Sequence, residues 1–80
     1  MQVTGYITRK TDAAVQFVAE RDAGLDSVRP LWVPVSKLTG PVRESDAMGR
    51  KIKTAQDGER IGIPATLSVD DDFLRKVKWI

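Results

Sequence analysis

The segment LWVPVSKL, residues 31–38, guides the interpretation of this chain, because it joins β-branched residues to a large aromatic residue and a proline. Valines are strong sheet formers, so we expect a strand over residues 31–38. Pro34 has no backbone N–H to donate, which places this strand at the edge of a sheet or at a bulge. We expect Trp32 to pack in the core or at that edge; the alternative is a surface that presents Trp32 to a partner.

Two strands are predicted before this segment. Residues 3–8 are rich in sheet formers, and residues 13–20 place Val15 and Phe17 on one side and Gln16 and Glu20 on the other. That period of two predicts a strand with one buried face. The alanines make a helix the alternative over residues 13–20, but Val15, Phe17 and Val18 favour a strand. The polar stretch 21–29 then reads as a loop.

A hairpin is predicted around Asp57-Gly58, the favoured dipeptide of a two-residue type I′ turn. Counting outward from this turn places the apolar side chains of the two strands on one face. The predicted pairs are Gln56 with Glu59, Thr54 with Ile61, and Ile52 with Ile63. Residues 39–49, which precede the hairpin, read as a long mobile connection.

The opposite face of this hairpin is expected to carry a basic stripe of Lys51, Lys53 and Arg60, extended by Arg43 and Arg50. Cations on a sheet face are able to follow phosphates. Binders of single strands usually interleave aromatic residues for stacking, and this face is predicted to have none. A solvated hairpin face is the alternative interpretation.

Residues 68–80 predict a C-terminal helix, with Ser68 as N-cap and Asp71 at the third helical position. Acidic residues lead and basic residues follow, which suits the helix dipole. The predicted ion pairs are Asp71 with Arg75 and Asp72 with Lys76. The predicted apolar stripe is Val69, Phe73, Val77 and Ile80. Trp79 lies off this stripe and is a candidate contact for a partner or a second copy; a strand over residues 77–80 is the alternative.

The 80 residues predict a single domain over residues 1–80, with 13 basic and 11 acidic side chains and a net charge of +2. The chain has no cysteine and no histidine, so a disulfide framework, a thiolate zinc site and a serine–histidine nucleophile are excluded. The three aspartates 70–72 would point about 100° apart on a helix and cannot converge on one metal ion. We therefore expect no enzyme and no cofactor. With no basic, apolar leader and no apolar run of about 20 residues, we expect a cytoplasmic protein.

Two short motifs carry a resemblance: TDAAV at residues 11–15 and WVPVS at residues 32–36. In this order they resemble small proteins of bacteriophage and prophage gene clusters, in which a T-D-x-A-V strand precedes a W-[IV]-P-x-S strand. The resemblance covers about half of the chain. Many members end in a W-L-A type helix, whereas this chain has DDFL at residues 71–74. No catalytic or ligand residue is carried over from this group.

Small phage proteins without catalytic residues often block a host machine. The resemblance therefore implies an inhibitor such as an anti-CRISPR protein, which would bind a type I CRISPR interference complex and block target DNA. Alternatives are a nucleic-acid-binding accessory module and a self-associating structural phage component. The candidate partner-binding residues are Arg43, Arg50, Lys51, Lys53, Arg60 and Trp79.

The expected fold is α+β or mainly β, with about five short antiparallel strands and a C-terminal helix. The sheet is expected to be curved or small-barrel-like, because closure protects the edges of so small a sheet.

Overall fold

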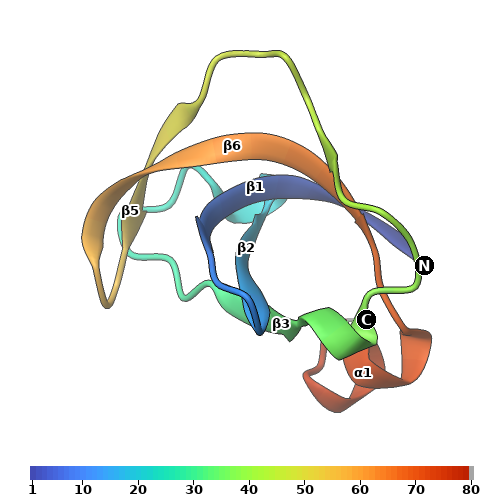
Figure 1. Ribbon diagram of the computed structural model, residues 1–80. Coiled ribbons are helices and arrows are strands. Elements are labelled where there is room, and N and C mark those ends of the chain that lie inside the picture. The colour runs from blue at the N-terminus through green and yellow to red at the C-terminus, as the bar shows by residue number, and fades with distance from the viewer. Residues whose placement is uncertain (80) are drawn as a thin grey trace.

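The computed structural model describes residues 1–79 and is mainly β, with a strongly curled antiparallel sheet and one short helix (Figure 1). The strands are β1 (Gln2–Lys10), β2 (Ala14–Ala19), β3 (Leu31–Pro34), β4 (Arg43–Glu44), β5 (Arg50–Thr54) and β6 (Gly58–Ser68). The helix is α1 (Asp71–Lys76), and single 3-10 turns occupy Glu20–Asp22 and Val35–Lys37. The expected curved antiparallel sheet with a C-terminal helix is confirmed, with six strands.

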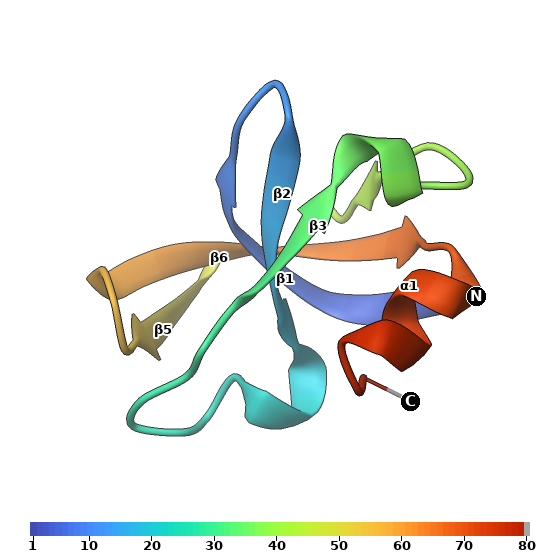
Figure 2. The same ribbon diagram turned by 90° about the horizontal axis from the view of Figure 1, so that it is seen from below.

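The strand order is β3-β2-β1-β6-β4, and β5 pairs with the first half of β6. Because β6 is long, its second half is free to pair with β1 and β4 while its first half forms the hairpin with β5. Two isolated bridges, Val28 with Thr54 and Leu38 with Val69, tie the loops on either side of β3 to the curled sheet. The β5–β6 hairpin and α1 lie on opposite sides of the molecule in both views (Figures 1 and 2).

The sheet buries apolar residues on both of its faces. Paired residues share a face, so the register defines a Phe17 face and a Tyr6 face. The core on the Phe17 face consists of Val3, Ile7, Val15, Phe17, Val33, Ala65, Leu67, Val69 and Leu74. The smaller core on the Tyr6 face consists of Val18, Ala23, Val28 and Ile52, against which Tyr6 packs.

The β2 strand lies between these two cores. Residues 15–19 of β2 are all buried, so the prediction of a strand with one buried face is wrong. The reason lies in the following loop, which packs Ala23 and Val28 onto Val18 and covers the second face. Gln16 is also buried, and it accepts a hydrogen bond from the Thr8 hydroxyl at 2.7 Å.

The β3 strand is the edge strand that Pro34 predicts, although it ends at Pro34 rather than at Leu38. The Val35 N–H donates to the carbonyl of Ala13 on the β2 side. Because backbone groups alternate along a strand, those of Trp32 and Pro34 point to the open edge, where a proline costs no ladder bond. Trp32 lies on this edge and is 38% exposed.

The register of the β5–β6 hairpin differs from the prediction by three residues. Lys53 pairs with Glu59 and Ile52 pairs with Arg60, so residues 55–57 form the loop. The Thr54 side chain explains the longer loop, since its hydroxyl donates to the Gly58 carbonyl at 2.8 Å and accepts from the Asp57 N–H at 3.1 Å.

The helix is shorter than predicted and begins later. Ser68 ends β6 instead of capping the helix, because its backbone pairs with Gln2 and accepts from the Thr39 N–H. Asp70 is the N-cap and accepts from the Phe73 N–H at 3.0 Å.

The predicted apolar stripe is right for Val69, which is buried, and for Phe73, which packs against the larger core, but wrong for Val77. Leu74 is its buried residue, and Val77, beyond the last helical residue, is exposed. Arg75 pairs with Asp72 rather than with Asp71. Residues 77–79 are neither helix nor strand, and Ile80 lies outside the described residues.

Candidate functional site

The strand arginines all lie on one face of the sheet. Each forms a cross-strand pair with a residue of the Tyr6 face: Arg9 with Gln16, Arg43 with Thr66, Arg50 with Gly62, and Arg60 with Ile52. No acidic residue of the described strands shares this face. The loop that covers its centre, residues 20–30, carries charges of both signs.

The strand lysines and glutamates lie on the Phe17 face. These residues are Lys10, Lys51, Lys53, Glu44 and Glu59. The Lys10 ammonium contacts the Glu44 carboxylate at 2.6 Å, and the Lys51 ammonium lies 3.9 Å from Glu59. The two faces therefore differ in charge. On the Phe17 face, glutamates partly neutralise the lysines, whereas on the Tyr6 face no acidic residue of a described strand accompanies the arginines.

Arg60 is held in place by the backbone of β1. Its Nε donates to the Thr8 carbonyl at 3.1 Å. Thr8 is the extra residue of a β-bulge between Ile7 and Arg9, which turns its side chain onto buried Gln16. Arg60 is half-buried, so its guanidinium is fixed from one side and its two terminal nitrogens remain for a ligand.

Trp32 lies in the same cross-strand row as Arg9. Trp32 pairs with Gln16, and Gln16 pairs with Arg9. Neighbouring strands lie about 4.8 Å apart, so two strand spacings, about 10 Å, separate the Trp32 and Arg9 backbones. The Tyr6 face thus combines arginines with an exposed indole ring.

A second aromatic residue, Tyr6, lies under an arginine of this face. The Arg50 guanidinium carbon is 6.0 Å from the centre of the Tyr6 ring. A cation over an aromatic ring contributes about 0.5–1 kcal/mol at an exposed site, which favours one orientation of Arg50.

The residues of the predicted basic stripe do not lie together. Lys51 and Lys53 point to the Phe17 face, whereas Arg50 and Arg60 point to the Tyr6 face. Arg43 belongs to β4 at the other end of β6. The stripe as predicted is therefore wrong, because a register shift of three residues exchanges the faces of one strand relative to the other.

Trp79 is half-buried rather than free. Its ring centre lies 6.0 Å from that of Phe17, and the Arg21 guanidinium carbon is 5.6 Å from the indole. Trp79 therefore contributes to packing within the chain, and its contact with a partner stays a prediction.

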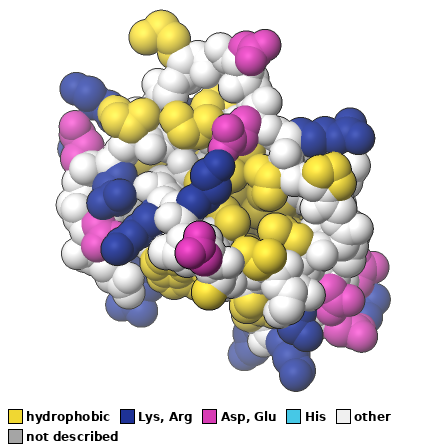
Figure 3. Space-filling model, in the orientation of Figure 1, with side chains coloured by type: hydrophobic (Ala, Val, Ile, Leu, Met, Phe, Trp, Pro, Cys, Tyr) yellow, Lys and Arg dark blue, Asp and Glu magenta, His cyan; other side chains and the backbone are white. Residues whose placement is uncertain are grey.

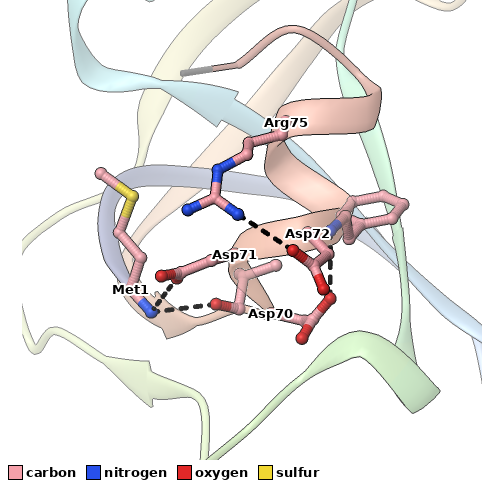
Figure 4. Close-up of polar contacts among 7 residues, drawn as sticks. Met1, Asp70, Asp71, Asp72 and Arg75 are labelled. Atoms are coloured by element: carbon pink, nitrogen blue, oxygen red, sulfur yellow. Dashed lines mark hydrogen bonds and ion pairs between the residues drawn. The ribbon is translucent and has the colours of Figure 1, made fainter.

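A polar cluster at α1 connects the residue before β1 to the first turn of the helix that follows β6 (Figure 4). The Met1 ammonium contacts the Asp71 carboxylate at 2.9 Å and the Val69 carbonyl at 3.0 Å. The hydrogen bond and the positive charge of this ammonium lower the pKa of Asp71. An open hollow beside the cluster is lined by side chains of both signs, including Lys37, Asp72 and Lys76.

The acidic residues do not assemble a metal centre in the part of the chain that the structure describes. No three of the Asp and Glu side chains in residues 1–79 converge in the way a metal ion requires. Within the same residues, α1 is far too short to cross a bilayer, and no helix has the length and apolar character to do so.

The chain was compared with protein families, curated proteins and solved structures, and none of the three comparisons gives a match.

Proposed function

We propose that this chain is a non-enzymatic accessory module of a bacteriophage that binds nucleic acid through the Tyr6 face. The observation that supports this function is the separation of charge, with all four strand arginines on one face and all strand glutamates on the other. Arg9, Arg43 and Arg50 are exposed. A planar guanidinium forms two parallel hydrogen bonds with a phosphate, which an ammonium cannot do.

The salt dependence of this binding gives the number of phosphates that the protein contacts. Each contact releases condensed counterions, so the logarithm of the affinity falls by about 0.7–0.9 per unit of log salt for each phosphate. Three exposed arginines therefore correspond to a slope of about two to three. The small net charge of +2 does not oppose this, because local charge on one face determines the contact.

The chain offers a charge-matched pair of variants for the test. The first variant carries Arg9→Gln, Arg43→Gln and Arg50→Gln; the second carries Lys10→Gln, Lys51→Gln and Lys53→Gln on the opposite face. Affinity for a labelled DNA 20-mer is measured by fluorescence anisotropy between 50 and 200 mM salt. We expect the arginine variant to lose about two to three units of salt slope, and the lysine variant to keep the slope of the unchanged protein.

Two results would contradict the proposal. Equal losses in the two variants would mean that only net charge matters and that the Tyr6 face is not the site. No measurable binding of the unchanged protein to single- or double-stranded DNA at 50 mM salt would exclude the function itself.

A second candidate function is the inhibitor of a host CRISPR interference complex, acting in the host cytosol. It is favoured by exposed apolar side chains around Gly49: Ile61 is 53% exposed, Ile63 37% and Met48 93%. Figure 3 shows apolar side chains lying beside basic and acidic ones on the side of the molecule seen in Figure 1. Exposed apolar patches rimmed by charges are typical of protein-binding surfaces.

The inhibitor function is tested with a purified type I interference complex and its target DNA. The unchanged protein is expected to reduce target binding, and Ile61→Glu is expected to abolish this effect while Lys53→Gln retains it. Undiminished target binding in the presence of excess protein would exclude this candidate.

A further inference from the structure

Trp32 and Arg60 provide, on one face, the two chemical groups that recognise a nucleotide. An exposed indole offers a flat apolar surface on which a base stacks, and a guanidinium offers donors for a phosphate. We propose that Trp32, Arg9 and Arg60 form a subsite for one unpaired nucleotide, so that the module prefers single-stranded nucleic acid. This inference rests on the proposed function and assigns the part of the Tyr6 face that reads the base.

The position of Trp32 on the edge strand leaves its ring accessible. β3 has no neighbouring strand on its open side among the described residues, and Pro34 faces that side without an N–H. The cross-strand neighbour of Trp32 on this face, Gln16, is only 1% exposed, whereas Trp32 itself is 38% exposed. A base therefore meets the ring from the solvent side.

Arg60 is organised before any ligand arrives. Its Nε bond to the Thr8 carbonyl restrains the long side chain, so less rotamer entropy is lost when a phosphate binds. Within residues 1–79, its terminal nitrogens have no hydrogen-bond or ion-pair partner. Arg9 follows Thr8 directly in β1 and is exposed, so its side chain begins one residue from the carbonyl that holds Arg60.

The bulge connects the two halves of the subsite. Thr8 accepts from Arg60 through its carbonyl and donates to Gln16 through its hydroxyl, and Gln16 pairs with Trp32. The arginine and the indole are thus linked through one buried polar pair. Two strand spacings, about 10 Å, separate the Trp32 and Arg9 backbones, a distance that a nucleotide spans.

The stacking partner decides the form of nucleic acid. In a duplex, both faces of each base are already stacked on neighbours, so the indole finds no free π-face. In a single strand, each base offers one, and stacking on an aromatic side chain is tolerant of sequence. The preference for unpaired nucleotides follows from Trp32, whereas the arginines alone would bind either form.

Intrinsic fluorescence tests the subsite directly. The chain has two tryptophans, so a Trp79→Phe background leaves Trp32 as the reporter. An unlabelled 16-mer of deoxythymidine and a duplex of equal length are titrated at 50 mM salt. We expect quenching by the single strand alone, and a Trp32→Ala change is expected to weaken single-strand binding about tenfold while leaving duplex binding unchanged.

Outcomes separate the inference from the function on which it rests. Salt-dependent binding of both forms with equal affinity and no quenching overturns the subsite and leaves the proposed function standing. Absence of binding to either form overturns both. Because Trp32→Ala removes a large ring, Trp32→Phe is included; it keeps an aromatic surface and is expected to retain most of the single-strand preference, and a loss equal to that of Trp32→Ala would overturn the stacking role.

Discussion

Gly58 illustrates how one residue determines the hairpin. Its φ of 71° lies in the left-handed region, and a Cβ added there would meet no atom within 4 Å. Any cost of a side chain at this position is therefore conformational and not steric. The sequence correctly marks Asp57-Gly58 as a turn, but the turn length depends on the Thr54 hydroxyl, which the dipeptide does not encode.

Gly58→Ala is expected to lower the free energy of unfolding by about 1–2 kcal/mol, the cost of a left-handed conformation for an L-residue. Gly24→Ala is the matched control, because Gly24 does not have a positive φ and an added Cβ would only touch an Arg50 nitrogen at 3.4 Å. Urea unfolding of both variants checks this. A Gly58→Ala protein as stable as the unchanged one would contradict the left-handed assignment.

Asp71 gives the folded state a pH dependence. Its pKa is lowered in the folded protein, first by the hydrogen bond and charge of the Met1 ammonium and then by Arg75. A carboxyl whose pKa is depressed on folding stabilises the protein above its unfolded pKa, and the contribution is lost as the pH falls through the folded value. Asp71→Asn is therefore expected to reduce Tm at pH 7.

The difference in Tm between the unchanged protein and Asp71→Asn should shrink as the pH falls below about 4. Because the carboxylate is exposed, the difference should also diminish in high salt. Asp46→Asn removes the same charge from a residue without an ion pair in the described chain and serves as control. A Tm difference that stays constant from pH 7 to pH 2 would show that the effect of Asp71 is not electrostatic.

At the scale of elements, the edge strand was predictable and the register was not. Pro34 alone restricts β3 to an edge, and β-branched composition marks β1 and β2, so these predictions depend on local chemistry. The β5–β6 register depends on a side-chain bond across the loop, and the end of β6 depends on pairing of Ser68 with residues far away in sequence. The gathering of the strand arginines on the Tyr6 face could therefore not be predicted from the sequence, because it requires the correct register of three strand pairs.

Pro34 also protects the open edge of β3. Its nitrogen faces the open side, so an added strand would find one missing donor there. Pro34→Thr restores an N–H and is expected to leave the fold intact while raising self-association. Sedimentation or light scattering across a concentration series checks this, with Pro41→Thr in the connection before β4 as control. Equal monodispersity of the two variants would mean that another feature blocks the edge.

At the scale of the whole molecule, two cores share one strand. Val15 and Phe17 of β2 belong to the larger core, and Val18 belongs to the smaller one. The sequence could not show this, because the loop that covers the second face has no periodic pattern. Its covering role comes from Ala23, Val28 and the bond between the Val28 N–H and the Lys53 carbonyl at 2.9 Å.

A shared central strand implies that the two cores unfold together. Ile7 in the larger core and Ile52 in the smaller one are both buried, so Ile7→Val and Ile52→Val make the same chemical change on opposite faces. Each is expected to lower the free energy of unfolding by about 0.5–1.5 kcal/mol. If β2 couples the cores, the transition stays single in both variants, and in a Trp32→Phe background the fluorescence of Trp79, which lies beside Phe17, coincides with far-UV circular dichroism. If Ile52→Val instead unfolds β5 and the loop of residues 20–30 first, the circular dichroism change would precede the fluorescence change. The smaller core on the Tyr6 face would then fold separately from the larger one.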